Sequence, residues 1–450
     1  MFSTLALLAT IGGPTHLHVP VDRIPAFARR YRVGCSHCHV AFPKLNAVGE
    51  AFRLNGYRFP EGQPVPRGEP PVPLGEDPWK DLWPKAIWPG ELPGSMPFAA
   101  RIESDLEAAR DPAGRRVVNF RFPEDLYLLA GGTLGPHIGA FLETEWNRDE
   151  GPELLQARIF VGGLFPSLGK RALNLLVGLQ SLYLFTFGEQ QIDRIGRQGF
   201  LWQDFSAASI PPPGSAPETA PTSGFHPGMH TPAIELNGLL SPRVYYGIGL
   251  SQGAGESAVD NNRHKDLYMK LRVKSGGLGL DGSAPRRPSQ ASASFGTIPE
   301  RSLIAEAFGY FGSEPMPGGG DSPHRTLGAN VRFLVGRADL GVGYLWGRDD
   351  HPWGSGIGAL TRSSVFAKGE YSIYPWLIAS LKAERLAFSV PSAGSILRNR
   401  FVETHLMPGL VALVRQNVRL VAEADLFSTF QHPTTTNAPN GAWLRLDLAF

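Results

Sequence analysis

Cysteine is almost absent from this chain, whose 450 residues contain only Cys35 and Cys38. A zinc site built from cysteine and histidine needs four ligands, and no second cysteine pair is present to supply them. A thioredoxin-like motif should lie at a strand–helix junction of a βαβ unit, and no such unit surrounds this pair. The low cysteine content is instead typical of a protein exported to an oxidising compartment.

Long apolar runs and an excess of charge are also lacking. No stretch approaches the roughly 18 consecutive apolar residues of a membrane helix, and the mean hydropathy is −0.12. The formal net charge of +2 does not indicate a strongly acidic or basic partner. We find no nucleic-acid-binding motif, phosphate-binding loop or catalytic triad, so we expect no nucleic-acid partner.

The sequence Cys35-Ser36-His37-Cys38-His39 matches the attachment motif for a c-type haem. In such a motif the two thiols add to the haem vinyl groups and hold the porphyrin covalently. The histidine that follows is placed to bind one axial face of the iron. The motif therefore predicts one covalent haem c, with Cys35 and Cys38 as attachment sites and His39 as the proximal ligand of the haem iron.

The last ten residues alternate between apolar and polar side chains. Leu444, Leu446, Leu448 and Phe450 share one face of a predicted strand, and Arg445 lies on the other. A closed barrel satisfies its backbone between strands and needs apolar side chains only on its lipid face. A chain that ends on an aromatic residue after such alternation resembles the closing strand of bacterial outer-membrane barrels.

Similar segments recur along the chain and bring the number to about sixteen, an even number as bacterial barrels require. We therefore predict an all-β transmembrane barrel of about 16 antiparallel strands over residues 96–450, in the outer membrane of a Gram-negative-type bacterium. A large soluble β-sandwich is the alternative fold. The long polar connection 181–231 is expected to be an outer loop. The predicted strands are 97–109, 126–129, 137–146, 154–164, 173–179, 232–241, 243–253, 265–275, 302–312, 325–336, 337–347, 361–373, 376–388, 400–411, 416–429 and 441–450.

The N-terminal region divides into three predicted parts. Residues 1–20 read as an atypical signal segment, since no Lys or Arg precedes its apolar run. Residues 21–59 form a small α-helical monohaem cytochrome c segment with helices near 24–31 and 43–52, and residues 60–95 form a Pro-rich linker. The cytochrome segment is too short to bury a haem alone, so we expect it inside the barrel or at its periplasmic mouth. Its apolar side chains expected to pack on the haem are Phe27, Tyr31, Phe42, Leu45 and Phe52.

Other residues are candidates for the distal haem ligand, for partners of the haem propionates and for an iron-binding site. Met96 is a candidate distal ligand of the haem iron, because Met/His ligation raises the reduction potential. His16, His18 and His37 are alternative candidates, and a five-coordinate iron without a distal ligand is a further alternative. Arginines that would pair with the haem propionates are Arg29, Arg30 and Arg32. Candidate iron-binding groups near the outer mouth are Asp349, Asp350 and His351, and also His226 and His230.

The stretch from Pro25 to Arg30, the haem motif, the stretch from Phe42 to Asn46 and the pair Gly56-Tyr57 resemble the outer-membrane cytochrome-porin fusions. The best-known members of that family are outer-membrane cytochromes of iron oxidisers. The resemblance implies an electron path from extracellular Fe(II), or another reductant, through the haem to a periplasmic carrier such as a c-type cytochrome. It thus implies a possible Fe(II):cytochrome c oxidoreductase. Alternatives are a porin or transport channel whose haem-bearing segment is a plug or sensor, and a haem-bearing structural or adhesion protein.

Overall fold

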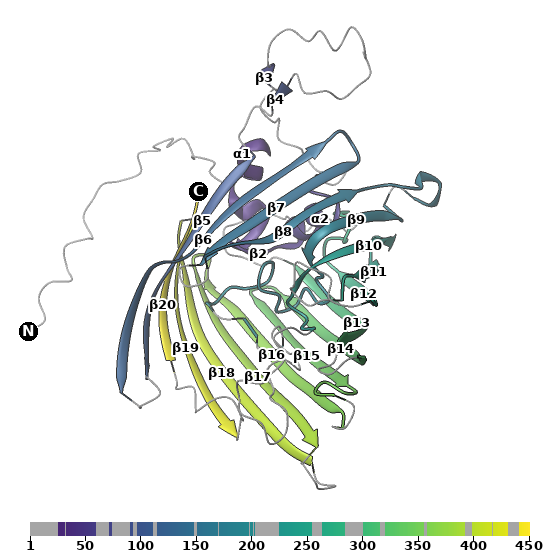
Figure 1. Cartoon of the computed structure of the whole chain (residues 1–450). Coiled ribbons are helices and arrows are strands. Elements are labelled where there is room, and N and C mark those ends of the chain that lie inside the picture. The colour runs from purple at the N-terminus through teal and green to yellow at the C-terminus, as the bar shows by residue number, and fades with distance from the viewer. Residues whose placement is uncertain are drawn as a thin grey trace, which may run out of the picture.

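The computed structural model describes residues 26–31, 33–59, 72–73, 91–92, 97–110, 115–147, 151–169, 171–197, 199–200, 202, 225–253, 263–283, 300–315, 320–354, 358–391, 398–415, 417–430 and 441–450. Strands β5 to β20 form a closed antiparallel barrel (Figure 1). No helix in this described part is long and apolar enough to cross a membrane. The barrel strands are β5 Phe98–Arg110, β6 Arg116–Leu134, β7 Ile138–Asn147, β8 Gly151–Val161, β9 Asn174–Ser181, β10 His230–Ser241, β11 Val244–Ser251, β12 Asp266–Gly276, β13 Arg301–Pro315, β14 Asp321–Val335, β15 Ala338–Asp349, β16 Leu360–Tyr374, β17 Leu377–Pro391, β18 Arg398–Arg415, β19 Val418–Phe430 and β20 Gly441–Ala449.

The last strand closes the barrel on the first. In this antiparallel seam between β20 and β5, Leu444 lies opposite Leu106 and Leu448 lies opposite Ile102. Closure leaves no strand of the barrel with an unpaired edge. The predicted sixteen-stranded antiparallel barrel and the role of its C-terminal strand are confirmed.

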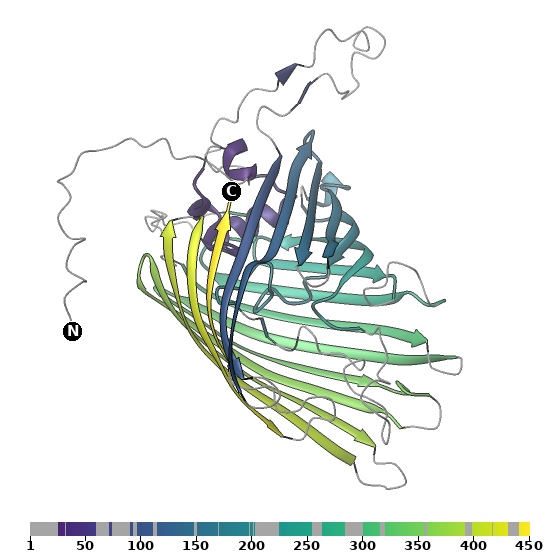
Figure 2. The ribbon, with the colours of Figure 1, turned by 60° about the vertical axis from the view of Figure 1, so that its left-hand side comes forward.

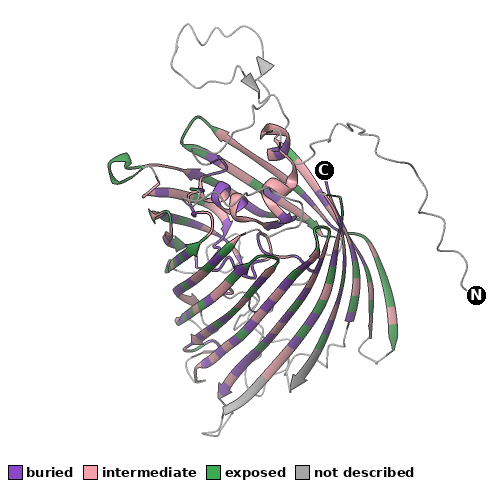
Figure 3. Cartoon of the chain, turned by 180° about the vertical axis from the view of Figure 1, so that it is seen from behind, coloured by how far each residue is buried: buried purple, intermediate pink, exposed green. Residues whose placement is uncertain are grey.

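The two faces of the barrel wall differ in exposure, and Figure 3 shows buried and exposed residues alternating along the strands. On the outer face of β15, Leu340 and Val342 are each 50% exposed. On its lumen face, Asp339 and Leu345 are fully buried. Apolar side chains exposed on an outer face are stable where lipid covers them. The alternation therefore fits a barrel with a lipid-facing exterior and a packed, polar interior.

The two ends of the barrel have different connections. At one end β14 and β15, β16 and β17, and β18 and β19 are joined by two residues each, 336–337, 375–376 and 416–417. Short turns face the periplasm in outer-membrane barrels. The C-terminus lies at this same end (Figure 2).

The described residues of the connection between β9 and β10 lie in the lumen. We call its described residues, 182–197, 199–200, 202 and 225–229, the inner loop. Leu182, Leu184, Phe185 and Phe187 of this loop are at most 3% exposed and belong to an apolar cluster with wall residues. The prediction of a polar outer loop over 181–231 was therefore wrong for the described residues, because these apolar side chains are buried inside the barrel.

The N-terminal segment lies inside the barrel near the short-turn end (Figures 1 and 2). We call its described residues, 26–31 and 33–59, the plug. Arg58 donates a hydrogen bond of 2.8 Å to the carbonyl of Gly135, in the turn between β6 and β7. This position agrees with the predicted lumen or periplasmic mouth. The plug contains α1 Ala26–Tyr31, η1 Cys35–His37, β1 His39–Ala41, β2 Lys44–Leu45 and α2 Ala47–Leu54.

Much of the region flanking the plug lies outside the described residues. This holds for the predicted signal segment 1–20 and for Met96, His16, His18 and Arg32. Within the predicted linker 60–95, the described residues are β3 Val72–Pro73 and β4 Glu91–Leu92, which pair antiparallel.

Strand β6 is longer than the predicted strand 126–129. Gly131 and Gly132 lie within β6, and the turn follows at residues 135–137. A Cβ atom on Gly131 would lie 2.5 Å from Cζ of Phe27 in α1. The close approach of the plug to the wall thus explains why residue 131 is a glycine.

Gly139 of β7 offers a test of this docking. A Cβ atom there would lie 2.3 Å from the carbonyl oxygen of Gly56, a backbone atom that no side-chain rotation can move away. We expect Gly139→Ala to weaken plug docking by about 1–3 kcal/mol, measured as faster protease cleavage within residues 26–59 of a still-folded barrel. Gly132→Ala is the control, because its Cβ would meet nothing nearer than 3.7 Å. Equal protection of the two variants would contradict the expectation.

Candidate functional site

A cavity of about 460 Å³ lies between the plug, the inner loop and a wall formed mainly by β5 to β8. Cys35, Cys38 and His39 all line it from the plug side. Its volume falls within the range of roughly 300–1,000 Å³ that is usual for ligand pockets. The structure therefore places the three residues of the predicted attachment motif on one internal cavity.

The motif loop is held in place by the start of α2. Asn46 caps this helix, accepting hydrogen bonds of 3.0 Å from the backbone amides of Val48 and Gly49. The same side chain donates to the carbonyls of Ser36 and His37 at 3.1 Å each. The helix consequently begins at Ala47 and not near Pro43 as predicted, because the Asn46 side chain satisfies the first free amides. Asn46 thereby fixes the motif against α2.

Gly49 allows α2 to approach the motif closely. A Cβ atom at this position would lie 2.1 Å from the carbonyl oxygen of Cys38. Since that oxygen belongs to the backbone, any larger residue would displace the helix or the attachment loop. Cys38 also borders the cavity, so the spacing of the helix from the motif sets one wall of the site.

His39 has the environment of a neutral ligand. Its Nδ1 lies 3.0 Å from the carbonyl oxygen of Pro43 and donates to it, since a carbonyl can only accept. Burial lowers the pKa of His39 to about 4, so the imidazole is uncharged at neutral pH. A neutral ring with Nδ1–H engaged keeps the lone pair of Nε2 for a metal ion.

Aromatic rings of the plug form the apolar walls of the cavity. Phe27 stacks on Tyr57 with ring centroids 5.4 Å apart and meets Phe52 edge-on at 5.2 Å. The five apolar residues predicted to pack on a haem all line this cavity. Two thiols, one neutral imidazole and apolar walls form a donor set and a surface that fit a c-type haem. The lining apolar residues predicted from the sequence are Phe27, Tyr31, Phe42, Leu45 and Phe52.

The basic residues at the cavity differ from those predicted. Arg29 donates to the carbonyl of Phe98, and Arg30 donates to Oγ1 of Thr133 at 2.6 Å. Neither of these arginines lines the cavity. The arginines that do so come from α2, β5, β8 and the inner loop, elements far apart in sequence, and no local motif marks them. They are Arg53, Arg101, Arg158 and Arg194.

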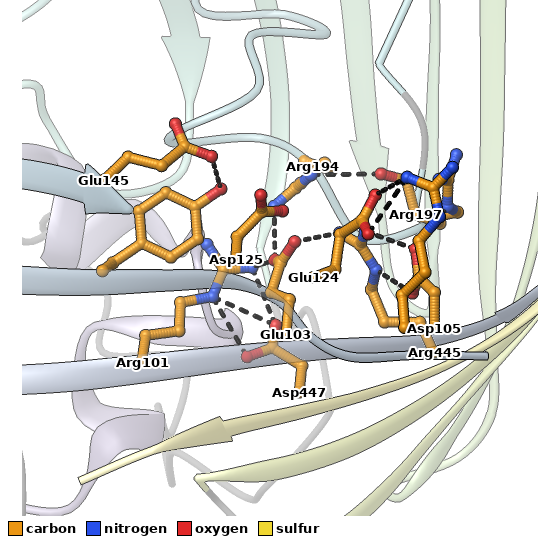
Figure 4. A network of polar contacts seen from close by, with 12 residues as sticks. Arg101, Glu103, Asp105, Glu124, Asp125, Glu145, Arg194, Arg197, Arg445 and Asp447 are labelled. Carbon is orange, nitrogen blue, oxygen red and sulfur yellow. Dashed lines mark hydrogen bonds and ion pairs between the residues drawn. The ribbon is translucent and has the colours of Figure 1, made fainter. Parts of the chain in front are cut away.

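An ionic network fastens the inner loop to the seam of the barrel (Figure 4). Arg194 donates to Glu103 at 2.6 Å, and Arg197 donates to Asp105 at 2.8 Å. Both carboxylates also bind Arg445 of β20. The network joins the loop to the first and last strands, and it holds Arg194 at the cavity.

Lys44 joins the plug, the inner loop and the wall at one point. Its Nζ lies 3.2 Å from Asp193 of the loop and 2.5 Å from both Asp339 and Glu370 of the wall. Burial acts to lower the pKa of Lys44, but the three carboxylates outweigh this effect and raise it. Lys44 is therefore charged at neutral pH, and its ion pairs hold the plug to the inner loop and the wall.

Asp349, Asp350 and His351 lie at the end of β15 opposite the short turns, as predicted for the outer mouth, but the two acids are engaged by arginines. Asp349 pairs with Arg362 at 3.0 Å, and Asp350 pairs with Arg348 at 2.7 Å. His226 and His230 line the internal cavity, and the ring of His37 packs against Phe59. Among the residues that the structure describes, no cluster of three or more Cys, His, Asp or Glu side chains is arranged to hold a metal ion.

The barrel is similar in structure to solved outer-membrane proteins. The anion-selective porin from Comamonas acidovorans has a TM-score of 0.52 and 11% sequence identity, over 78% of this chain and 98% of that one. The fold is that of a porin. OmpT of Vibrio cholerae has a TM-score of 0.49 at 11% identity, over 79% and 98% of the two chains. Pseudomonas putida OprB has a TM-score of 0.47 at 9% identity, over 78% and 94%.

The porin likeness concerns the barrel fold. No protein-family model and no curated protein matches this sequence. A porin fold with an apolar outer face places this barrel in the outer membrane of a Gram-negative-type bacterium, in contact with lipid.

Proposed function

We propose that this protein carries one covalent haem c in its lumen cavity and passes electrons across the outer membrane. The electrons would come from extracellular Fe(II) or another reductant and leave to a periplasmic carrier such as a c-type cytochrome. The observation that supports this function best is the meeting of Cys35, Cys38 and His39 on one cavity inside the barrel. As a cytochrome-porin fusion, the chain would combine the porin fold with a redox centre.

The residues of the cavity have separate roles in this proposal. Cys35 and Cys38 would tether the porphyrin, and His39 would bind the iron as proximal ligand. When bound, a c-type haem supplies a one-electron redox centre. The hydrogen bond from His39 to Pro43 orients the imidazole, and the aromatic walls exclude water. Met96 remains a candidate for the distal position, and His226 and His230 join it because they line the same cavity.

The position of the cavity suits transfer between the two sides of the membrane. A bilayer core of ~30 Å is a barrier to direct electron transfer. The plug contacts the short-turn end through Arg58, the end expected to face the periplasm. A redox centre at the plug would therefore divide the span and lie near the periplasmic carrier.

Anaerobic stopped-flow mixing of the purified protein with Fe(II) tests the donor. We expect the haem absorption to change to that of the reduced form on mixing, and we expect His39→Ala to alter both the rate and the spectrum, since the iron loses its proximal ligand. A haem that Fe(II) fails to reduce at physiological pH, while another donor reduces it readily, would remove iron from the proposal and leave electron conduction.

A second candidate function is a transport channel in which the plug acts as a gate or sensor. The porin fold favours it, and the anion-selective porin from Comamonas acidovorans is one protein with that fold. The packing of the plug and the inner loop in the lumen opposes free passage of solutes, since Phe185 and Phe187 are fully buried there. Solute flux through the reconstituted, plug-containing protein would favour the channel over the electron conduit.

A further inference from the structure

Arg158 of β8 is a buried cation on the wall of the lumen cavity. Its side chain lines the cavity, and the residue is 6% exposed. The guanidinium carbon lies 5.7, 5.1 and 5.0 Å from the ring centroids of Tyr57, Phe141 and Tyr183. One of its terminal nitrogens donates to the hydroxyl of Tyr57 at 2.5 Å. Aromatic faces and the neutral hydroxyls of Tyr57 and Tyr183 thus surround the charge.

The other arginines of the cavity are neutralised by carboxylates. Arg53 pairs with Glu50 at 2.7 Å, Arg101 pairs with Asp447 at 2.8 Å, and Arg194 pairs with Glu103 at 2.6 Å. Among the described residues, Arg158 forms no ion pair, and its buried Nε has no hydrogen-bond partner. Arg158 therefore differs from the other arginines of the cavity, since no carboxylate among the described residues forms an ion pair with it.

A nearby carboxylate does not fill this role. Glu143 of β7 also lines the cavity, and its charge acts on that of Arg158. The two side chains form no ion pair, and Glu143 instead accepts a hydrogen bond of 2.9 Å from Nε2 of Gln156. A guanidinium removed from water is stable only when a negative charge or hydrogen-bond acceptors replace its hydration. Stacking on aromatic rings compensates for part of that loss, and the N–H groups that remain are suited to the oxygens of a carboxylate.

We propose that Arg158 binds a carboxylate of the molecule that occupies the cavity. Under the proposed function, on which this assignment rests, that carboxylate is a haem propionate. The cation and the propionate would form an ion pair in the cavity, with the Tyr57 hydroxyl as the neighbouring donor. A free carboxylate solute carries the same chemistry and is the other source to be distinguished.

The haem midpoint potential at fixed pH tests the ion pair. Loss of a positive charge near the iron stabilises the ferric form, so Arg158→Gln should lower the potential and reduce severalfold the ratio of reduced to oxidised haem at a given solution potential. Arg158→Lys keeps the charge and should return the potential toward that of the natural protein. Tyr57→Phe removes the hydroxyl partner but not the cation, and should change the potential less than Arg158→Gln.

The outcomes separate this inference from the proposed function. If Arg158→Gln binds covalent haem with an unchanged potential, the ion pair is refuted while the haem stands. If Arg158→Gln fails to fold, as judged by heat-modifiable gel migration, the Lys variant decides, since an altered potential despite the retained charge would count against the ion pair. If the natural protein contains no haem, calorimetric titration with sodium propionate applies. Binding that is lost in Arg158→Gln and retained in Arg158→Lys would support a free solute, and no binding would overturn the assignment.

Discussion

Replacement of both Cys35 and Cys38 by alanine is expected to remove all covalently bound haem and leave the barrel folded. The two thiols are the only cysteines of the chain, so no other side chain can form the thioether bonds of a c-type haem. The barrel should persist, because its closure depends on the β20–β5 seam and not on the attachment loop. Haem staining of a denaturing gel measures the attachment, and heat-modifiable migration measures barrel folding.

His39→Ala is the matched variant for this experiment. It keeps both thiols and should keep the covalent haem, but the iron loses the imidazole that the hydrogen bond to Pro43 positions. Its gel stain should therefore resemble that of the natural protein while its absorption spectrum differs. Haem staining that survives the loss of both cysteines would refute covalent attachment, and so would a natural protein that loses its haem on the gel.

Lys44→Met is expected to open the lumen to ions. The substitution removes the cation and leaves the buried Asp193, Asp339 and Glu370 with less compensation. Removing one partner of a buried ion pair costs about 3–5 kcal/mol. If that energy is drawn from plug docking, the ratio of undocked to docked plug rises by roughly 10² to 4 × 10³. Planar-bilayer recordings should show steady pore openings in the variant and a closed natural protein.

The control for this recording is Lys265→Met, which removes an exposed lysine directly before β12. It should leave the conductance unchanged, since Lys265 is distant in sequence and in contacts from the plug. Large, steady conductance from the natural protein would show that the plug and inner loop leave a pore. A Lys44 variant as closed as the natural protein would show that other contacts, such as that of Glu50 with Arg272, suffice.

The barrel was predictable because each strand meets the same two environments along its length. Lipid on one side and the lumen on the other impose a period of two, whatever partner strand is present. The first part of β6 was not predicted, because the period of two is disturbed there. The register of β6 with β5 shifts between Glu103 and Asp105, and Pro123 lies within the strand. The alternation of Val118 and Phe120 is therefore out of step with that of later residues.

The candidate site was only partly predictable, since its components differ in how local they are. Cys35, Cys38 and His39 belong to one short motif, which the sequence displays directly. The partners of Lys44 lie 295 and 326 residues away along the chain, and Arg158 lies 101 residues from Tyr57. Such contacts depend on barrel closure and on the inward path of the inner loop, neither of which leaves a local pattern around these residues.

The packing of residues 35–39 bears on the order of events during biogenesis. In the folded protein this peptide is held by Asn46 on one side and lies against a cavity lined by the inner loop and the wall on the other. An enzyme that attaches haem must hold the peptide in its own active site, and these contacts would have to open first. A haem at Cys35 and Cys38 would therefore be attached in the periplasm while the chain is still open. Pairing of β20 with β5 would then close the barrel around a plug that already carries haem. Assembly in the membrane would therefore depend on the supply of haem.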